Sequence, residues 1–186
     1  FIELADTYLR LFSNRKPLPN TSKFDDMPEF PFGREKSFSI NTKIKTGIVD
    51  VAFLTDDFWD IQQTRRLSVL SKIVSERLRE QIREDLGAAY SPYAYHHPSQ
   101  NFKNFGLLHL VVQVDPVRSS DIHNTIKKII QELHQSGLSK EEIALVRKPL
   151  INQLNVYRST NSYWLNSVMK NSSKFPQKYE WAITMM

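Results

Sequence analysis

The stretch from about residue 60 to residue 86 constrains the fold most, because its apolar side chains recur at the spacing of one long helix. These side chains lie three or four positions apart and form a single face made of Leu67, Leu70, Val74, Leu78 and Ile82. Asp56 and Asp57 precede the stretch as candidate capping residues. Gly87 follows it, and glycine commonly ends a helix because it adopts a positive φ freely. We expect this helix to cover one face of a sheet.

Two pairs of strands are predicted on either side of this helix. Residues 36–45 alternate apolar and polar side chains, which is the period of a half-buried strand, and residues 49–53 repeat the pattern after a Thr-Gly pair. Together these two segments predict an antiparallel hairpin. Residues 88–96 and 106–114 predict a second pair of strands, joined by a polar turn at 98–104.

Three further features organise the ends of the chain. Residues 3–12 have apolar side chains at helical spacing and predict a short amphipathic helix. The prolines between residues 14 and 35 indicate a surface connector, because proline has no amide donor and a fixed φ. A helix is predicted after Asp115, ending at Gly137. Its apolar side consists of Ile122, Ile126, Ile129, Ile130 and Leu133.

The last third of the chain predicts more helix. Ser139 and Glu142 have the spacing of a capping box, in which each side chain satisfies an end amide of the helix. Pro149 is expected to kink or split that helix, since a proline inside a helix costs roughly 3 kcal/mol. Residues 157–186 predict further helix, whose aromatic side chains either complete the local core or belong to an interface with another part of the protein.

This order of elements predicts an α+β fold, in which an antiparallel sheet has helices on one face. The length of 186 residues suits a single domain. Within it we expect a helix at 1–13, a connector at 14–35 and the main α+β domain at 36–186.

Charge and composition exclude several classes of protein. The 25 basic residues are interleaved with 20 acidic ones, so the net charge of +5 forms no basic arm for nucleic acid. Without cysteine, neither a disulfide framework nor a thiolate metal site can form. No apolar run approaches the ~18–20 residues that cross a bilayer, which predicts a soluble domain. The first residues form no signal peptide and already begin a helix, so we expect a fragment of a longer polypeptide.

The sequence does not encode a self-sufficient active site. None of the five histidines has a histidine or carboxylate partner at the helical spacing that places two metal ligands on one face. His96 and His97 are expected to point to opposite faces of a strand, and His123 and His134 to lie on the polar side of their helix. A Gly-x-Ser-x-Gly elbow and a glycine-rich phosphate loop are both missing. We therefore expect this chain alone to bind no metal.

The remaining candidate is the run Arg-Leu-Arg-Glu-Gln-Ile-Arg-Glu-Asp-Leu-Gly-Ala-Ala-Tyr-Ser-Pro at residues 77–92, where Arg83 and Tyr90 flank a glycine. On the residues alone, an arginine near a helix end offsets the helix dipole, and tyrosine is ordinary in a strand. The run resembles the signature of the C-terminal half of insulinase/pitrilysin-type zinc peptidases, the inverzincins, and especially of their bacterial members. Weaker similarities follow in the same order, at residues 114–116, 137–142 and 161–165.

This resemblance implies a division of labour between two halves of an enzyme. In the family, the N-terminal half carries an inverted His-x-x-Glu-His zinc motif and a downstream glutamate ligand, whereas the C-terminal half has the same fold without metal and closes over the substrate. Arg83 and Tyr90 match the arginine and tyrosine of the C-terminal half that reach toward the zinc. This chain contains no His-x-x-Glu-His, so zinc is expected from the N-terminal half of the polypeptide or from a sister subunit. The isolated chain is expected to be inactive.

The chemistry of the two side chains agrees with these implied roles. Attack on a peptide carbonyl builds negative charge on its oxygen, and one prepositioned donor lowers the barrier by about 3–4 kcal/mol in comparable sites. Tyr90 offers a neutral phenolic donor, and Arg83 offers a planar, permanently charged set of donors. Both residues would help to bind and polarise a peptide or small-protein substrate of a zinc metalloendopeptidase.

Two other functions remain open at this point. Some relatives of this fold are non-catalytic scaffolds or partner subunits, and a His-x-x-Glu-His motif elsewhere in the polypeptide would decide against that role. A ferredoxin-like nucleic-acid binder would need exposed aromatic side chains on its sheet beside basic residues. The resemblance to bacterial members implies the periplasm, and the cytoplasm stays allowed.

Overall fold

The computed structural model describes residues 2–10, 27–86 and 91–184. Contacts divide the chain into two compact units, Phe1–Arg34 and Glu35–Met186, and each is described by itself. The grouping of residues 1–186 into one domain stays a prediction. The first unit contains helix α1 (Ile2–Arg10), which confirms the predicted N-terminal helix, although the end predicted for that helix lies outside the described residues.

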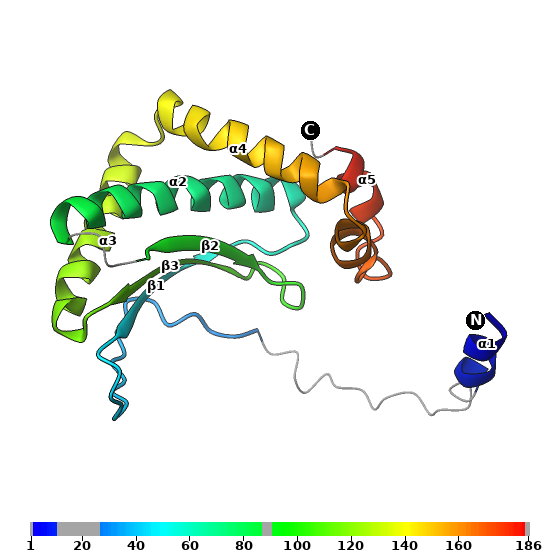
Figure 1. Ribbon diagram of the computed structural model, residues 1–186, viewed down its shortest axis with the longest axis horizontal. Helices are drawn as coiled ribbons and strands as arrows, with labels where there is room; N and C mark the ends of the chain where they lie inside the picture. Colours follow the sequence, from blue (N-terminus) through cyan, green and yellow to red (C-terminus); the bar gives the residue numbers. More distant parts are fainter. Residues whose placement is uncertain (1, 11–26, 87–90, 185–186) are drawn as a thin grey trace. The chain divides into compact units, whose positions relative to one another are not determined.

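The second unit is an α+β structure in which helices lie on one face of an antiparallel sheet (Figure 1), as predicted. Along the chain, its first part alternates strands and a long helix: β1 (Gly47–Thr55), α2 (Ile61–Leu86), β2 (Tyr93–Pro98) and β3 (Gly106–Val114). Its second part is helical: η2 (Pro116–Arg118), α3 (Ser119–Ser136), α4 (Lys140–Arg158), the π-helix η3 (Tyr163–Met169) and α5 (Lys178–Ile183).

The sheet has the strand order β1-β3-β2, so β3 is its central strand. Both neighbours run antiparallel to β3, with Val51 opposite Leu110 on one side and Ala94 opposite Leu110 on the other. The strand predicted at 106–114 is therefore confirmed. The strand predicted at 88–96 begins later, at Tyr93, and the first residues of that prediction lie outside the described part of the chain.

The predicted hairpin of residues 36–45 with 49–53 is wrong. The first of these segments forms no strand, and its alternating side chains Phe38, Ile40 and Ile44 are 82%, 81% and 70% exposed. Strand β1 pairs with β3 instead. This pairing places the apolar side chains of β1 beside the buried side chains of β3, beneath the helices. Burial of a large apolar side chain stabilises the fold by about 1.5–3 kcal/mol. An alternating pattern of apolar and polar residues, as in residues 36–45, does not by itself provide a neighbouring strand or helix against which the apolar side chains can be buried.

The boundaries of the helices follow local capping. Asp60 caps α2, because its Oδ1 accepts a hydrogen bond from the Gln63 amide at 2.9 Å. The predicted caps Asp56 and Asp57 are therefore wrong, since they lie too far from the first helical residue. Asp57 is buried and instead accepts hydrogen bonds from the amides of Trp59 (2.8 Å) and Asn104 (2.6 Å). Its carboxylate thereby joins the turn after β1 to the turn before β3.

The two helices after the sheet were predicted correctly in outline. Helix α3 buries Ile122, Ile126 and Ile129, and it ends at Gly137, whose φ is 69°. Helix α4 begins with the predicted capping box of Ser139 and Glu142. It runs unbroken through Pro149, so the predicted split is wrong, and the alternative of a kink stays a prediction.

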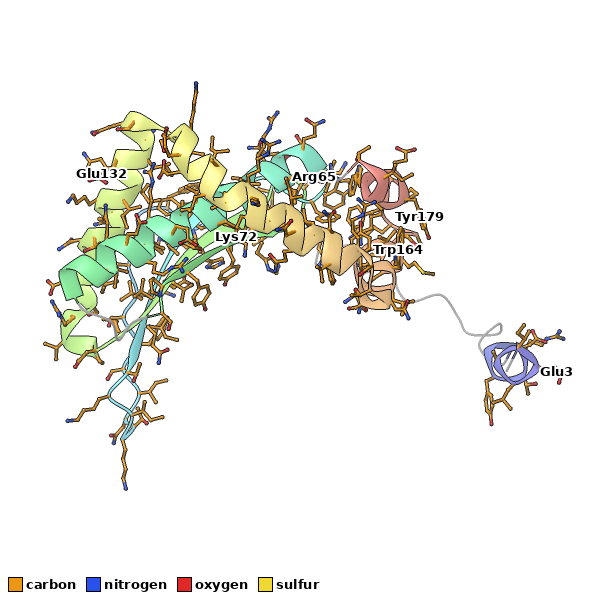
Figure 2. The ribbon with its side chains drawn as sticks, turned by 45° about the horizontal axis from the view of Figure 1, so that its top comes forward. Glu3, Arg65, Lys72, Glu132, Trp164 and Tyr179 are labelled. Atoms are coloured by element: carbon orange, nitrogen blue, oxygen red, sulfur yellow. The ribbon has the colours of Figure 1, made fainter. Side chains whose placement is uncertain are left out.

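The C-terminal segment is only partly α-helical. After α4 it continues as the π-helix η3 and the short helix α5, so the further helix predicted for residues 157–186 is confirmed in part. Arg65 of α2 connects this segment to the rest of the unit, because its Nη2 donates to the Trp181 carbonyl at 2.7 Å. Figure 2 shows Arg65 near the first turn of α2 and Trp164 beyond the C-terminal end of α4.

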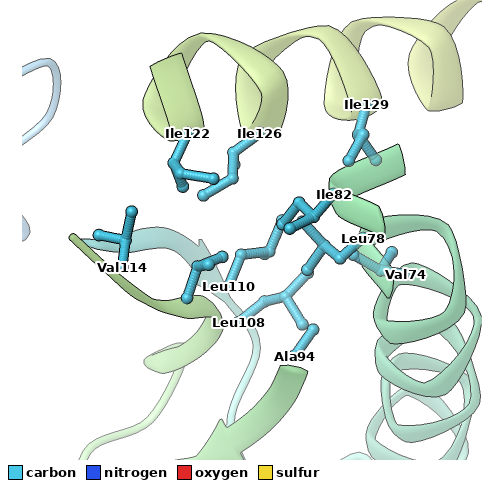
Figure 3. Close-up of a cluster of buried hydrophobic side chains, with 11 residues drawn as sticks. Val74, Leu78, Ile82, Ala94, Leu108, Leu110, Val114, Ile122, Ile126 and Ile129 are labelled. Carbon is cyan, nitrogen blue, oxygen red and sulfur yellow. The ribbon is translucent and has the colours of Figure 1, made fainter. Parts of the chain in front are cut away.

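The hydrophobic core lies between the sheet and the helices α2 and α3 (Figure 3). Both helices and all three strands contribute apolar side chains from one face. The fully buried members are Val74, Leu78 and Ile82 of α2, Leu110, Val112 and Val114 of β3, and Ile122, Ile126 and Ile129 of α3. This layer fixes the position of α2 above the strands. Among the described residues, no helix combines the length and apolar character needed to cross a membrane.

Candidate functional site

The two predicted site residues belong to the junction between α2 and β2. Arg83 lies in the last turn of α2, and its side chain lies outside the described part of the structure. Tyr90 and Gly87 belong to residues 87–90, which also lie outside the described part. The described neighbours of this junction are its two ends, α2 up to Ile82 and β2 from Tyr93.

The first fixed end, α2, is held on its core side. Val74, Leu78 and Ile82 lie four positions apart, and each is at most 1% exposed. All three pack against the same apolar cluster as Leu108 and Leu110 of the central strand. The helical turn that precedes Arg83 is therefore fixed to the sheet.

A second side of α2 is held by hydrogen bonds to the other helices. The Arg77 guanidinium forms a bidentate pair with Glu142 of α4, in which Nη2 lies 2.9 Å from Oε2, and Nη2 also donates to the Gly137 carbonyl at 2.9 Å. This pair lowers the pKa of Glu142 to about 2, chiefly because the carboxylate accepts hydrogen bonds from Arg77. One turn later, Gln81 Nε2 donates to Glu132 of α3 at 3.3 Å. The pair of Arg77 and Glu142 thus joins α2 to the corner between α3 and α4.

A third side of α2 meets β2. Ser75 Oγ accepts a hydrogen bond from the Ala94 amide at 2.7 Å, which ties the second residue of β2 to the middle of α2. Helix α2 and β2 form a rigid frame for both ends of the junction.

The sheet face opposite the helices carries a row of rings that the sequence did not reveal. Tyr93 and Tyr95 of β2 stack with centroids 5.9 Å apart, and Tyr95 stacks on His109 of β3 at 4.8 Å with the ring planes 9° apart. His109 Nδ1 lies 3.0 Å from Asp50 Oδ2 on β1. We call these four residues the open-face row. His109 thus has a carboxylate partner 59 positions away, which only the strand register could have shown.

The electrostatics of the open-face row further favour the neutral form of its central phenol, that of Tyr95. The pKa of Tyr95 is raised, first by burial against its neighbours and then by the negative charge of Asp50. The three strands contain no lysine or arginine. The exposed tyrosines therefore lie beside a carboxylate rather than beside the basic residues that a nucleic-acid-binding sheet needs, which argues against that reading.

The histidines of β2 have different surroundings. His97 is exposed, whereas His96 is half-buried toward the helices, as expected for adjacent residues of a strand. The Nε2 atom of His96 lies 3.1 Å from Thr55 Oγ1, and burial lowers the pKa of His96. His134 is exposed on α3 and His123 is half-buried. Among the side chains that the structure describes, no three metal-binding groups come together, so a zinc site does not fit these residues.

The amino-acid sequence matches a known family over most of its length. A model described as the peptidase M16 inactive domain matches residues 1–150. The chain belongs to this family. The match confirms the resemblance to the zinc-free C-terminal part of insulinase/pitrilysin-type peptidases, and M16 peptidases generally depend on zinc. A search of curated proteins gave no significant match.

Two solved structures share the fold of this M16 inactive domain. The periplasmic protease PqqL from Escherichia coli superposes with a TM-score of 0.61 at 14% identity, over 77% of this chain and 16% of the protease. The peptidase M16 inactive domain from Pseudomonas fluorescens superposes with a TM-score of 0.51 at 19% identity, over 58% of this chain and 26% of that one. The chain therefore spans less than a fifth of PqqL.

Proposed function

We propose that this chain is the metal-free C-terminal domain of a zinc metalloendopeptidase, where it closes over and binds the peptide substrate. The observation that carries this proposal is its membership of the M16 inactive-domain family. Zinc and its ligands then belong to another domain, either the N-terminal half of the same polypeptide or a sister subunit. The chain alone neither binds zinc nor cleaves peptides.

Within this function, Arg83 and Tyr90 are proposed to polarise the substrate. The phenol of Tyr90 donates a hydrogen bond to the oxygen of the scissile carbonyl, and the guanidinium of Arg83 holds a neighbouring carbonyl or carboxylate. The anchoring of α2 and β2 supports these roles, because catalytic donors must be held within about 0.5 Å of their working positions. Arg77, Ser75 and Ile82 supply that anchoring.

The open-face row is proposed to face the companion half and the bound peptide. Among the described residues, the helices that pack on the sheet lie on its other face (Figure 1). Tyr93 and Tyr95 are 50% and 39% exposed, and each combines an apolar ring with a hydroxyl group that can bind a peptide backbone. This face therefore offers both apolar contact and hydrogen bonds to an extended chain.

The place of action is proposed to be the periplasm. Support comes from the structural likeness to PqqL, which is a periplasmic protease. Fractionation of the source cells, followed by detection of the full-length protein, tests this assignment. Recovery in the cytoplasmic fraction would contradict it.

A comparison of the full-length protein with this chain tests the proposed function. Each is purified, and its zinc content and its turnover of a fluorogenic peptide are measured. We expect the full-length protein, purified together with its sister subunit if the zinc is held there, to bind zinc and cleave the peptide, and this chain to do neither. A full-length protein that neither binds zinc nor cleaves a peptide or small protein would favour a scaffold role. Cleavage by this chain alone would contradict the division of labour.

A further inference from the structure

Helix α4 has apolar side chains on two sides. Packing against the core of the domain explains only one of these sides. Val146 is buried and Leu150 is half-buried on the inner side, as expected for a helix that packs on α2. On the outer side, Ile143 and Ile151 remain 42% and 45% exposed. An amphipathic helix at the surface of a domain normally has one apolar stripe and one polar face. The outer stripe of α4 therefore indicates a second contact.

The outer side of α4 is also basic. An open hollow between its side chains is lined by residues of α4 alone, mainly Lys140, Ile143, Ala144, Arg147, Lys148 and Ile151. The three basic side chains make no ion pair with any residue that the structure describes. Their charges are free to meet carboxylates from outside.

The charge of the chain supports this description of the surface. Residues 143–179 contain six lysines and arginines and no aspartate or glutamate, a formal charge of +6, whereas the rest of the chain has 19 basic and 20 acidic residues, a formal charge of −1. Two of the six, Arg147 and Lys148, lie on the outer side of α4, where they favour an acidic partner.

We propose that the outer side of α4 is the docking site of an acidic amphipathic helix of a partner protein. Ile143, Arg147 and Ile151 are four residues apart and form a ridge inclined to the helix axis, onto which a second helix packs its own apolar stripe. Carboxylates beside that stripe pair with Lys140, Arg147 and Lys148. This surface is separate from the junction that carries Arg83 and Tyr90.

The position of the basic residues favours a protein over a membrane surface. Helices that lie on membranes separate a charged face from an apolar face. On α4, Arg147 lies inside the apolar stripe, between Ile143 and Ile151. Insertion of that stripe into a lipid boundary would desolvate the guanidinium, whereas a helix with a carboxylate at this level pairs with it.

Binding of designed helices tests this proposal. The probes are a stapled 18-residue helix with leucines on one face and glutamates elsewhere, the same helix with lysines in place of the glutamates, and vesicles of anionic phosphatidylglycerol. Fluorescence anisotropy of labelled probes reports affinity for this chain. We expect the glutamate helix to bind at least tenfold more tightly than the lysine helix. The double variant Arg147→Glu, Lys148→Glu is expected to weaken binding of the glutamate helix at least tenfold.

The matched control changes the same amount of charge elsewhere. Lys72 of α2 (Figure 2) and Lys127 of α3 are exposed and make no ion pair with a described residue. Lys72→Glu with Lys127→Glu is expected to weaken binding less than threefold, and circular dichroism checks that all variants fold. Equal losses in both double variants would show nonspecific charge attraction and overturn the proposal. Binding to the vesicles alone would also overturn it, in favour of a lipid surface.

Discussion

The two faces of the three-stranded sheet are built from alternate residues of the same strands, yet they hold different chemistry. On the covered face, Leu108, Leu110 and Val112 are buried beneath helices and make only apolar contacts. On the open face, His109 pairs with Asp50 and stacks on Tyr95. Apolar burial has no preferred direction, whereas ring stacking and hydrogen bonds fix geometry. The covered face is therefore responsible for stability, and the open face offers groups for recognition.

Adjacent substitutions in β3 should separate the two faces most strongly. Leu110→Ala is expected to lower the free energy of unfolding by about 2–5 kcal/mol, because it leaves a cavity in the core. His109→Ala, one residue away on the open face, is expected to cost about 1–2 kcal/mol, since it removes the hydrogen-bond contact with Asp50 and the stacking on Tyr95. Urea denaturation of this chain measures both values. Equal losses would break the distinction between the faces.

The helices above the covered face also contain a polar contact, the ion pair of Arg77 and Glu142, whose contribution to stability depends on pH. The folded-state pKa of Glu142, about 2, lies below its ordinary value of 4.5. The pair therefore stabilises the fold at pH values above the ordinary pKa, and this stabilisation is lost as the pH falls from about 5 toward 2. The Glu142 side chain is 25% exposed, so solvent screening limits the effect to about 1–2 kcal/mol.

Glu142→Gln isolates this effect, because glutamine can keep the capping box while it removes the charge. At pH 7 the variant is expected to unfold about 1–2 kcal/mol more easily than the wild type, and near pH 2 the difference should nearly vanish. The neighbouring Glu141→Gln is the matched control, with an expected loss of about 0.5 kcal/mol or less. Equal losses in the two variants at pH 7 would contradict the assigned ion pair.

The smallest effect is expected on the open face. Asp50→Asn should lower the pKa of Tyr95 relative to the wild type, because it removes the nearby negative charge, while burial continues to raise that pKa. Titration of carbon-labelled tyrosine by NMR follows this change. Asp121→Asn, at an exposed site on α3, is the control and should leave the pKa of Tyr95 where it was. An unchanged Tyr95 titration in Asp50→Asn would show that the open-face row is not electrostatically coupled.

Much of the covered face could be predicted from the sequence, because local patterns specify it. The apolar face of α2, the strand at 106–114 and the capping box at Ser139 depend on residues close together in the chain. The segment 36–45 shows the limit of such patterns. Its alternation suits a strand, but pairing depends on which neighbour offers burial, and β1 finds that neighbour in β3.

The open-face row could not be predicted, because its contacts cross three strands. His109 and Asp50 meet only through the antiparallel register of β1 and β3, in which His109 lies opposite Ala52. The local patterns did not point to Arg83 and Tyr90 either. Arg83 and Tyr90 were found through a family resemblance, and the family is now shown, but their roles stay predictions.

The most direct test of the proposed mechanism is the turnover of a peptide substrate by the full-length enzyme. Tyr90→Phe and Arg83→Ala are each expected to lower turnover tenfold or more, which corresponds to about 1.4 kcal/mol or more of lost transition-state stabilisation, with zinc content unchanged. Arg79→Ala, one helical turn before Arg83, is the matched control and should keep most of the activity. Wild-type turnover in both Tyr90→Phe and Arg83→Ala would contradict the account.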